Sequence, residues 1–185
     1  MLNSIILISF GLFVVVFCAV SILVVFGRKN IIGKNPINKF IFITGKFALF
    51  ATWTLIVAHA MKKLILQDNP ELYFGWFGVS VYLVGILFAS ISIINMGNSI
   101  AMGTVYSRTK LKTNGLYAIS RNPMYIGFNL MSLGGAIYTF NYVLFILAIY
   151  TIVVHHLIII AEEKHLLQIF GKDWIDYSIK VGRYL

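Results

Sequence analysis

Residues 121–163 read RNPMYIGFNLMSLGGAIYTFNYVLFILAIYTIVVHHLIIIAEE. The segment Arg121-Asn122-Pro123 opens this stretch and the pair Glu162-Glu163 closes it, with two apolar runs between them that meet at Asn141. Each run is near the length that a helix needs to cross a bilayer, and so short a link predicts a tight antiparallel hairpin. The hairpin would return the glutamates to the start of the first helix. Polar groups are costly near lipid, so their convergence predicts a functional site at one membrane face.

The composition is that of a membrane protein. The chain has 185 residues, of which 59% are hydrophobic and 11% charged, whereas soluble domains carry about 25% charged residues. We expect an all-α, polytopic integral membrane protein with one domain, residues 1–185. Residues 1–94 would supply N-terminal spans and residues 95–185 the catalytic region. The single cysteine, Cys18, excludes an intrachain disulfide, a Cys-rich zinc site and an iron–sulfur cluster.

The apolar runs predict five transmembrane helices, a C-terminal helical hairpin and a cytosolic tail that begins at Glu162. Gly33 and Pro36 predict a loop after the first span, and residues 67–71 a turn after the second. Residues 97–114 form a polar, basic connection of irregular or short helical structure. The five predicted spans are Ile5–Phe26, Phe40–Leu66, Trp76–Met96, Met124–Phe140 and Tyr142–Ile160.

Basic residues predict the orientation. With the N-terminus outside, the outer side holds only Lys62 and Lys63, offset by Asp68 and Glu71. The catalytic face and the C-terminus are then cytosolic, and a prokaryotic plasma membrane fits the small size and the lack of sorting signals. The net charge of +9 therefore reflects topology, and nucleic acid is not an expected partner. The basic residues assigned to the cytosolic side are Arg28, Lys29, Lys34, Lys39, Arg108, Lys110, Lys112, Arg121, Lys164, Lys172, Lys180 and Arg183.

The polar residues each have a local interpretation too. Pro123 suits the first turn of a helix and Asn122 its N-cap, Arg121 could anchor to headgroups, and the glutamates could be a solvated helix continuation. Gly134-Gly135 predicts close helix packing.

The histidines on the fifth span are candidates for substrate contact. His155 lies seven residues before Glu162 and His156 seven before Glu163, so each pair shares a helix face. A metal site needs three or four ligands, and the spacing of these four residues is not typical of one, so no metal is expected.

At these residues the chain resembles the isoprenylcysteine carboxyl methyltransferase family and the related small membrane phospholipid methyltransferases. The resemblance covers roughly residues 95–185 and is specific in the order and spacing of its motifs. These are Gly115-Leu-Tyr117, Arg121-Asn-Pro-Met-Tyr-Ile-Gly127, Glu162-Glu163, Gly171-Lys-Asp-Trp174-Ile-Asp-Tyr177 and Val181-Gly-Arg183.

The resemblance implies S-adenosylmethionine-dependent methyl transfer, with S-adenosylhomocysteine as product, from a pocket closed by the hairpin and the tail. Asn122, Tyr125 and Glu162 would then lie where the methyl group meets the acceptor. Glu163 would support the pocket from behind. The cofactor-binding residues that the resemblance implies are Lys110, Leu111, Tyr117, Arg121, Asn122, Pro123, Met124, Tyr125, Glu162 and Glu163.

The residue types suit that cofactor. A carboxylate such as Glu162 can pair with the cofactor's cations or ribose hydroxyls, and Arg121 with its carboxylate. Tyrosine rings offer a face for adenine or for the cationic sulfonium.

The acceptor would be a lipophilic, membrane-resident molecule with an isoprenylcysteine-like carboxylate or a phospholipid-like amine. Prenylcysteine enzymes place an arginine one turn before the glutamate pair, where this chain has Ile158, so His155, His156 and Ile158 are the candidate substrate contacts. Two alternatives remain: an NADPH-dependent lipid or sterol reductase of related architecture, and a small membrane transporter.

Overall fold

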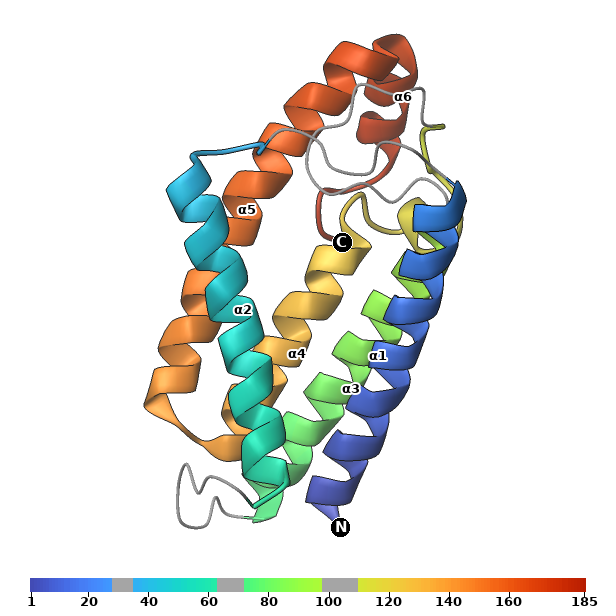
Figure 1. Cartoon of the computed structure of the whole chain (residues 1–185). Helices are drawn as coiled ribbons and strands as arrows, with labels where there is room; N and C mark the ends of the chain where they lie inside the picture. The colour runs from blue at the N-terminus through green and yellow to red at the C-terminus, as the bar shows by residue number, and fades with distance from the viewer. Residues whose placement is uncertain (28–34, 63–71, 98–109) are drawn as a thin grey trace.

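The computed structural model describes residues 1–27, 35–62, 72–97 and 110–185, and these residues form helices without any strand. Figure 1 shows the long helices side by side, with the short elements and the C-terminus gathered at one end. The predicted turn at 67–71, and most of the predicted loop and polar connection, lie outside the described residues. The elements are α1 (Leu2–Gly27), α2 (Lys39–Ala60), α3 (Leu72–Met96), η2 (Gly115–Ala118), α4 (Pro123–Thr139), α5 (Tyr142–Phe170) and α6 (Lys172–Lys180).

Four of the described helices, α1, α2, α3 and α5, are long and apolar enough to cross a membrane. The predicted count of five is not confirmed, because α4 has only 17 residues, at the lower limit of the roughly 17–25 that a span needs. The end predicted for the second span, Leu66, was wrong. The helix stops at Ala60, and Lys62 then adopts a positive φ of 56°.

The hairpin between α4 and α5 was correctly predicted. Phe140 ends α4 in the left-handed region (φ 49°), and the Asn141 side chain caps α5 by accepting hydrogen bonds from the Val143 and Leu144 amides at 3.0 and 3.2 Å. The chain thus reverses within two residues. α5 continues past Ile160 as a helix to Phe170, and Gly171 (φ 52°) turns the chain into α6.

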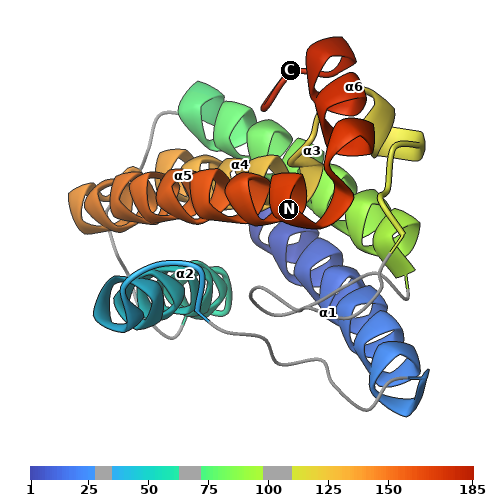
Figure 2. The ribbon, with the colours of Figure 1, turned by 90° about the horizontal axis from the view of Figure 1, so that it is seen from above.

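Glycines bring α3 and α4 into backbone contact. Gly78 and Gly85 on α3 are seven residues apart, as are Gly127 and Gly134 on α4, so each pair occupies one helix face. A Cβ added at Gly134 would lie 2.7 Å from the carbonyl oxygen of Gly78, and one at Gly85 would lie 2.8 Å from that of Gly127. The close packing predicted at Gly134 is confirmed. Figure 2 shows α4 held between α3 and α5.

We expect Gly134→Ala to destabilise the bundle by about 1–3 kcal/mol, because the added methyl group meets backbone atoms that cannot move aside. Gly11→Ala on α1 is the matched control, since a Cβ there meets nothing within 4 Å. Thermal unfolding in detergent measures both. A Gly134→Ala midpoint equal to that of Gly11→Ala would contradict the glycine interface.

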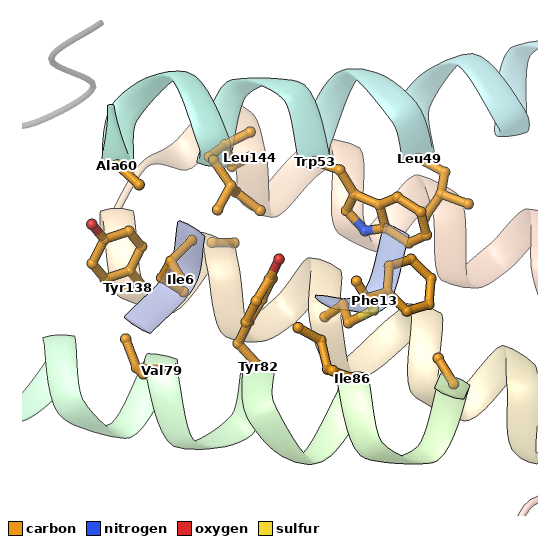
Figure 3. Close-up of a cluster of buried hydrophobic side chains, with 14 of the residues drawn as sticks. Ile6, Phe13, Leu49, Trp53, Ala60, Val79, Tyr82, Ile86, Tyr138 and Leu144 are labelled. Carbon is orange, nitrogen blue, oxygen red and sulfur yellow. The ribbon is translucent and has the colours of Figure 1, made fainter. Parts of the chain in front are cut away.

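An apolar core joins α1, α2 and α3 to α4. Figure 3 shows Trp53 of α2 beside Phe13 of α1, with Tyr82 of α3 reaching in from the opposite side. The centroid of the Trp53 ring lies 5.7 Å from that of Phe13 and 5.4 Å from that of Phe128 on α4, and both pairs pack edge to face. These contacts fix α4 within the bundle, and α4 in turn fixes the polar residues at its first turn.

Candidate functional site

Just before α4, the short helix η2 carries Tyr117 into the interior. Tyr117 is 5% exposed. Gly115 starts η2 with φ 64°, a left-handed conformation that favours glycine, and it packs against the Asn95 side chain of α3. The Tyr177 hydroxyl of α6 donates a 2.6 Å hydrogen bond to the Tyr117 carbonyl. The tail of the chain therefore holds η2 in place.

The first turn of α4 differs from an ordinary capped helix start. Pro123 takes the first helical position and Asn122 the N-cap position, as expected, but the Asn122 side chain makes no capping hydrogen bond. Its Nδ2 instead donates to Glu163 Oε1 at 3.0 Å and to the Arg183 carbonyl at 3.1 Å. The amide of Asn122 thus joins the hairpin and the C-terminal tail.

The two glutamates on α5 have different partners. Glu162 accepts hydrogen bonds from the Tyr125 hydroxyl at 3.0 and 3.1 Å. Glu163 is buried, and its Oε2 accepts from Arg183 Nε and Nη2 at 3.0 and 2.9 Å. Arg121 Nε lies 3.4 Å from Glu163 Oε1, within ion-pair distance. Glu162 therefore faces the pocket and Glu163 organises the structure behind it.

The helix α6 covers the site. Its buried residues, Trp174 and Tyr177, are three apart and share one face. The Arg121 guanidinium carbon lies 5.6 Å from the Trp174 ring centroid, at cation–π distance. This contact ties the start of α4 to α6.

These elements enclose a cavity of about 140 Å³. Typical ligand sites measure roughly 300–1,000 Å³, so a nucleoside-sized ligand would extend into the mouth of the pocket. The lining combines cations, one carboxylate, aromatic rings and apolar side chains. It consists of Met96, Lys110, Leu111, Lys112, Tyr117, Arg121, Asn122, Met124, Tyr125, Glu162, Leu166, Phe170, Trp174 and Tyr177.

The tyrosines and Arg183 keep their ordinary protonation states at neutral pH. Burial raises the pKa of Tyr177 to about 12, and burial, with Tyr177 and Glu162 nearby, raises the pKa of Tyr117. The hydrogen bond to Glu163 raises the pKa of Arg183. The phenols are therefore neutral and the guanidinium is charged. Among the described residues, no group of three His, Cys, Asp or Glu side chains could hold a metal ion.

Eight of the ten predicted cofactor residues line this one pocket, including all three predicted catalytic residues. The other two, Pro123 and Glu163, are buried and do not line it. Tyr117 and Glu162, 45 positions apart in the sequence, both line this pocket.

The predicted substrate residues do not line the pocket. His155 is buried beside Tyr125, with ring centroids 4.9 Å apart, and its Nδ1 lies 2.6 Å from Asn129 Oδ1. His156 hydrogen-bonds the Tyr184 hydroxyl. Ile158 is 3% exposed and offers only an apolar side chain. Their contact with a substrate stays a prediction.

Six lining residues were not predicted. Leu166 and Phe170 stand four and eight positions after Glu162, on its helix face, and this spacing could have identified them. Trp174 and Tyr177 were visible as a motif without an assigned role. No sequence pattern pointed to the remaining two, Met96 and Lys112.

Comparison with known proteins agrees with this architecture. The family model for phospholipid methyltransferases matches residues 73–173. The structure of the eukaryotic intramembrane Ras methyltransferase ICMT (isoprenylcysteine carboxyl methyltransferase) is similar in fold, with a TM-score of 0.55 and 23% sequence identity. The match covers 79% of this chain and 52% of that chain, so the present chain corresponds to about half of the ICMT chain. No curated protein matches the sequence.

Proposed function

Because the chain belongs to the phospholipid methyltransferase family, we propose that it transfers the methyl group of S-adenosylmethionine to a lipophilic acceptor in the membrane. The observation that carries this proposal is the Tyr125–Glu162 pair, which lines one pocket together with Tyr117 of η2 and Arg121, two residues before α4. The family favours methyl transfer over the reductase and transporter alternatives.

The donor set of the pocket fits the cofactor. S-adenosylmethionine carries a sulfonium, an ammonium and a carboxylate, and when bound it supplies the electrophilic methyl group. Glu162 can accept hydrogen bonds from the ammonium or the ribose, while the Arg121 guanidinium can pair with the carboxylate. The Tyr117 and Trp174 rings offer faces for the adenine or the sulfonium.

In this mechanism the protein acts by binding and alignment. The Tyr125 hydroxyl fixes both oxygens of Glu162, so the carboxylate is oriented before a ligand arrives. Direct displacement at carbon needs no covalent enzyme intermediate. Its rate depends on holding the nucleophile, methyl and sulfur in line, an effect worth up to about 7–11 kcal/mol.

A lipid amine is the acceptor that this chain supports best. Ile158, at the position where prenylcysteine enzymes carry an arginine, is buried and cannot pair with a carboxylate. The acceptor would enter sideways from the lipid, and the pocket would open to the cytosol with the N-terminus outside.

Methyl transfer to defined vesicles tests the proposal. The protein is reconstituted with phosphatidylethanolamine and supplied with S-adenosylmethionine labelled in its methyl group. We expect label in the lipid, and none with Glu162→Ala. Phosphatidylcholine vesicles are the matched control, since that lipid has the same phosphate and chains but a fully methylated amine. Absence of label from every lipid and small molecule of native membranes that contain the folded protein would overturn the function.

A further inference from the structure

Two guanidinium groups compete for one buried carboxylate behind the pocket. Glu163 is 8% exposed and lies between Arg183 of the tail and Arg121 at the start of α4. Arg183 binds it with two short hydrogen bonds, at 2.9 and 3.0 Å. Both bonds are charge-assisted and both end on the same oxygen, Oε2. Arg183 therefore satisfies one oxygen of Glu163 almost completely.

Arg121, in contrast, keeps most of its hydrogen-bonding capacity. Its Nε lies 3.4 Å from Glu163 but is buried without a hydrogen-bond partner among the described residues. Its only side-chain hydrogen bond in the described part of the chain is a long one, 3.5 Å from Nη1 to the Ser178 carbonyl. A buried donor without a partner is costly. The position therefore suits an additional anionic partner.

The position of Arg121 indicates where that partner binds. Its side chain lines the pocket and contacts the face of Trp174. Glu163 can balance the charge of only one of the two arginines, so the second guanidinium can pair with an anion that enters the pocket. That guanidinium would attract a carboxylate or another small anion.

We infer that Arg183 is a positioning residue, which occupies Glu163 and so leaves Arg121 available to bind the carboxylate of the cofactor. The inference rests on the proposed function and assigns a role to the C-terminal tail. The backbone supports it: the Arg121 amide donates to the Gly182 carbonyl at 3.0 Å, and Asn122 Nδ2 donates to the Arg183 carbonyl at 3.1 Å. These two hydrogen bonds hold Gly182 and Arg183 beside Arg121 and Asn122.

Two ligands that differ in the relevant group test the inference by calorimetry in detergent. S-adenosylhomocysteine carries the amino-acid carboxylate and ammonium, and 5′-methylthioadenosine has the same nucleoside thioether without either group. In the Arg183→Gln variant, Glu163 would lose its ion pair with Arg183 and would pair more closely with Arg121. We expect affinity for S-adenosylhomocysteine to fall about tenfold or more, the scale of a charged hydrogen bond. Affinity for 5′-methylthioadenosine should stay the same. Lys180→Gln, an exposed cation at the end of α6, should change neither.

A second substitution separates this role from a purely structural one. Adding Glu163→Gln to Arg183→Gln removes the competing charge, so the preference for S-adenosylhomocysteine should return. Equal loss of both ligands in Arg183→Gln, no loss of either, or no recovery in the double variant would overturn the inference and leave the proposed function standing. If neither ligand bound the folded wild-type protein, both proposals would fall together.

Discussion

The double variant Glu162→Ala, Tyr125→Phe is expected to lose binding of S-adenosylhomocysteine by roughly 100-fold or more. Glu162 is the only carboxylate in the pocket lining of the described residues, and the Tyr125 hydroxyl orients it through a hydrogen bond shared between its two oxygens. A hydrogen bond to a charged group is worth about 1.5–3 kcal/mol, and each 1.4 kcal/mol is tenfold in affinity. Two such contacts from Glu162 to the ligand account for the predicted loss. Isothermal titration calorimetry in detergent measures it.

The single variants and a neighbouring residue provide the controls. Tyr125→Phe alone should reduce the affinity for S-adenosylhomocysteine less than Glu162→Ala does, because the carboxylate remains but is less well oriented. Lys164→Ala, two positions along α5 and exposed, should bind like the wild type. Unchanged affinity in the double variant would exclude these residues from the cofactor site.

The second large effect is expected on stability, from Glu163→Ala. The Glu163 side chain is 10% exposed and Arg121 is 13% exposed, so this substitution leaves a nearly buried cation without its anion. Breaking a buried ion pair costs about 3–5 kcal/mol. We expect the lower end, about 3 kcal/mol, because Arg183 is 38% exposed and water can solvate it.

The loss of stability should be greatest in the C-terminal residues after α6, 181–185. Asn122 and Arg183 both lose their contact with Glu163, so the tail should become susceptible to proteolysis before the helical bundle unfolds. Limited proteolysis with mass spectrometry, alongside thermal unfolding, measures both effects. Glu163→Gln keeps the shape and one acceptor oxygen, and should be less damaging than Glu163→Ala. Equal thermal unfolding midpoints for Glu163→Ala and the wild type would contradict the structural role of this carboxylate.

The helices could be predicted from the sequence because their signals are local. Long apolar runs identify α1, α2, α3 and α5, and Asn141 between two such runs identifies the hairpin. The end of α2 was misplaced because Met61 and Leu64 kept the run apolar beyond the turn at Lys62. The predicted count of five spans is not confirmed for a different reason, since the 17 residues of α4 are near the lower limit for crossing a membrane.

The sequence could predict only the part of the pocket that forms where the two ends of the hairpin meet. The hairpin placed Glu162 beside the first turn of α4, and the resemblance to the methyltransferase family added Tyr117 to the same site. The role of the Asn122 side chain depends on Glu163 and Arg183, which are 41 and 61 residues away, so its local interpretation as a cap was incorrect in detail. The cover formed by Trp174 similarly depends on Gly171 reversing the chain after α5, which fixes the direction of α6.

Photolabelling tests the central claim most directly: that two distant segments of the chain form one binding site for S-adenosylmethionine. The wild-type protein is irradiated with methyl-labelled cofactor and digested, and the labelled peptides are sequenced. The structure predicts label in residues 110–125 and in residues 162–177, both suppressed by excess S-adenosylhomocysteine. Label confined to one of these segments, or placed elsewhere and insensitive to S-adenosylhomocysteine, would contradict the account.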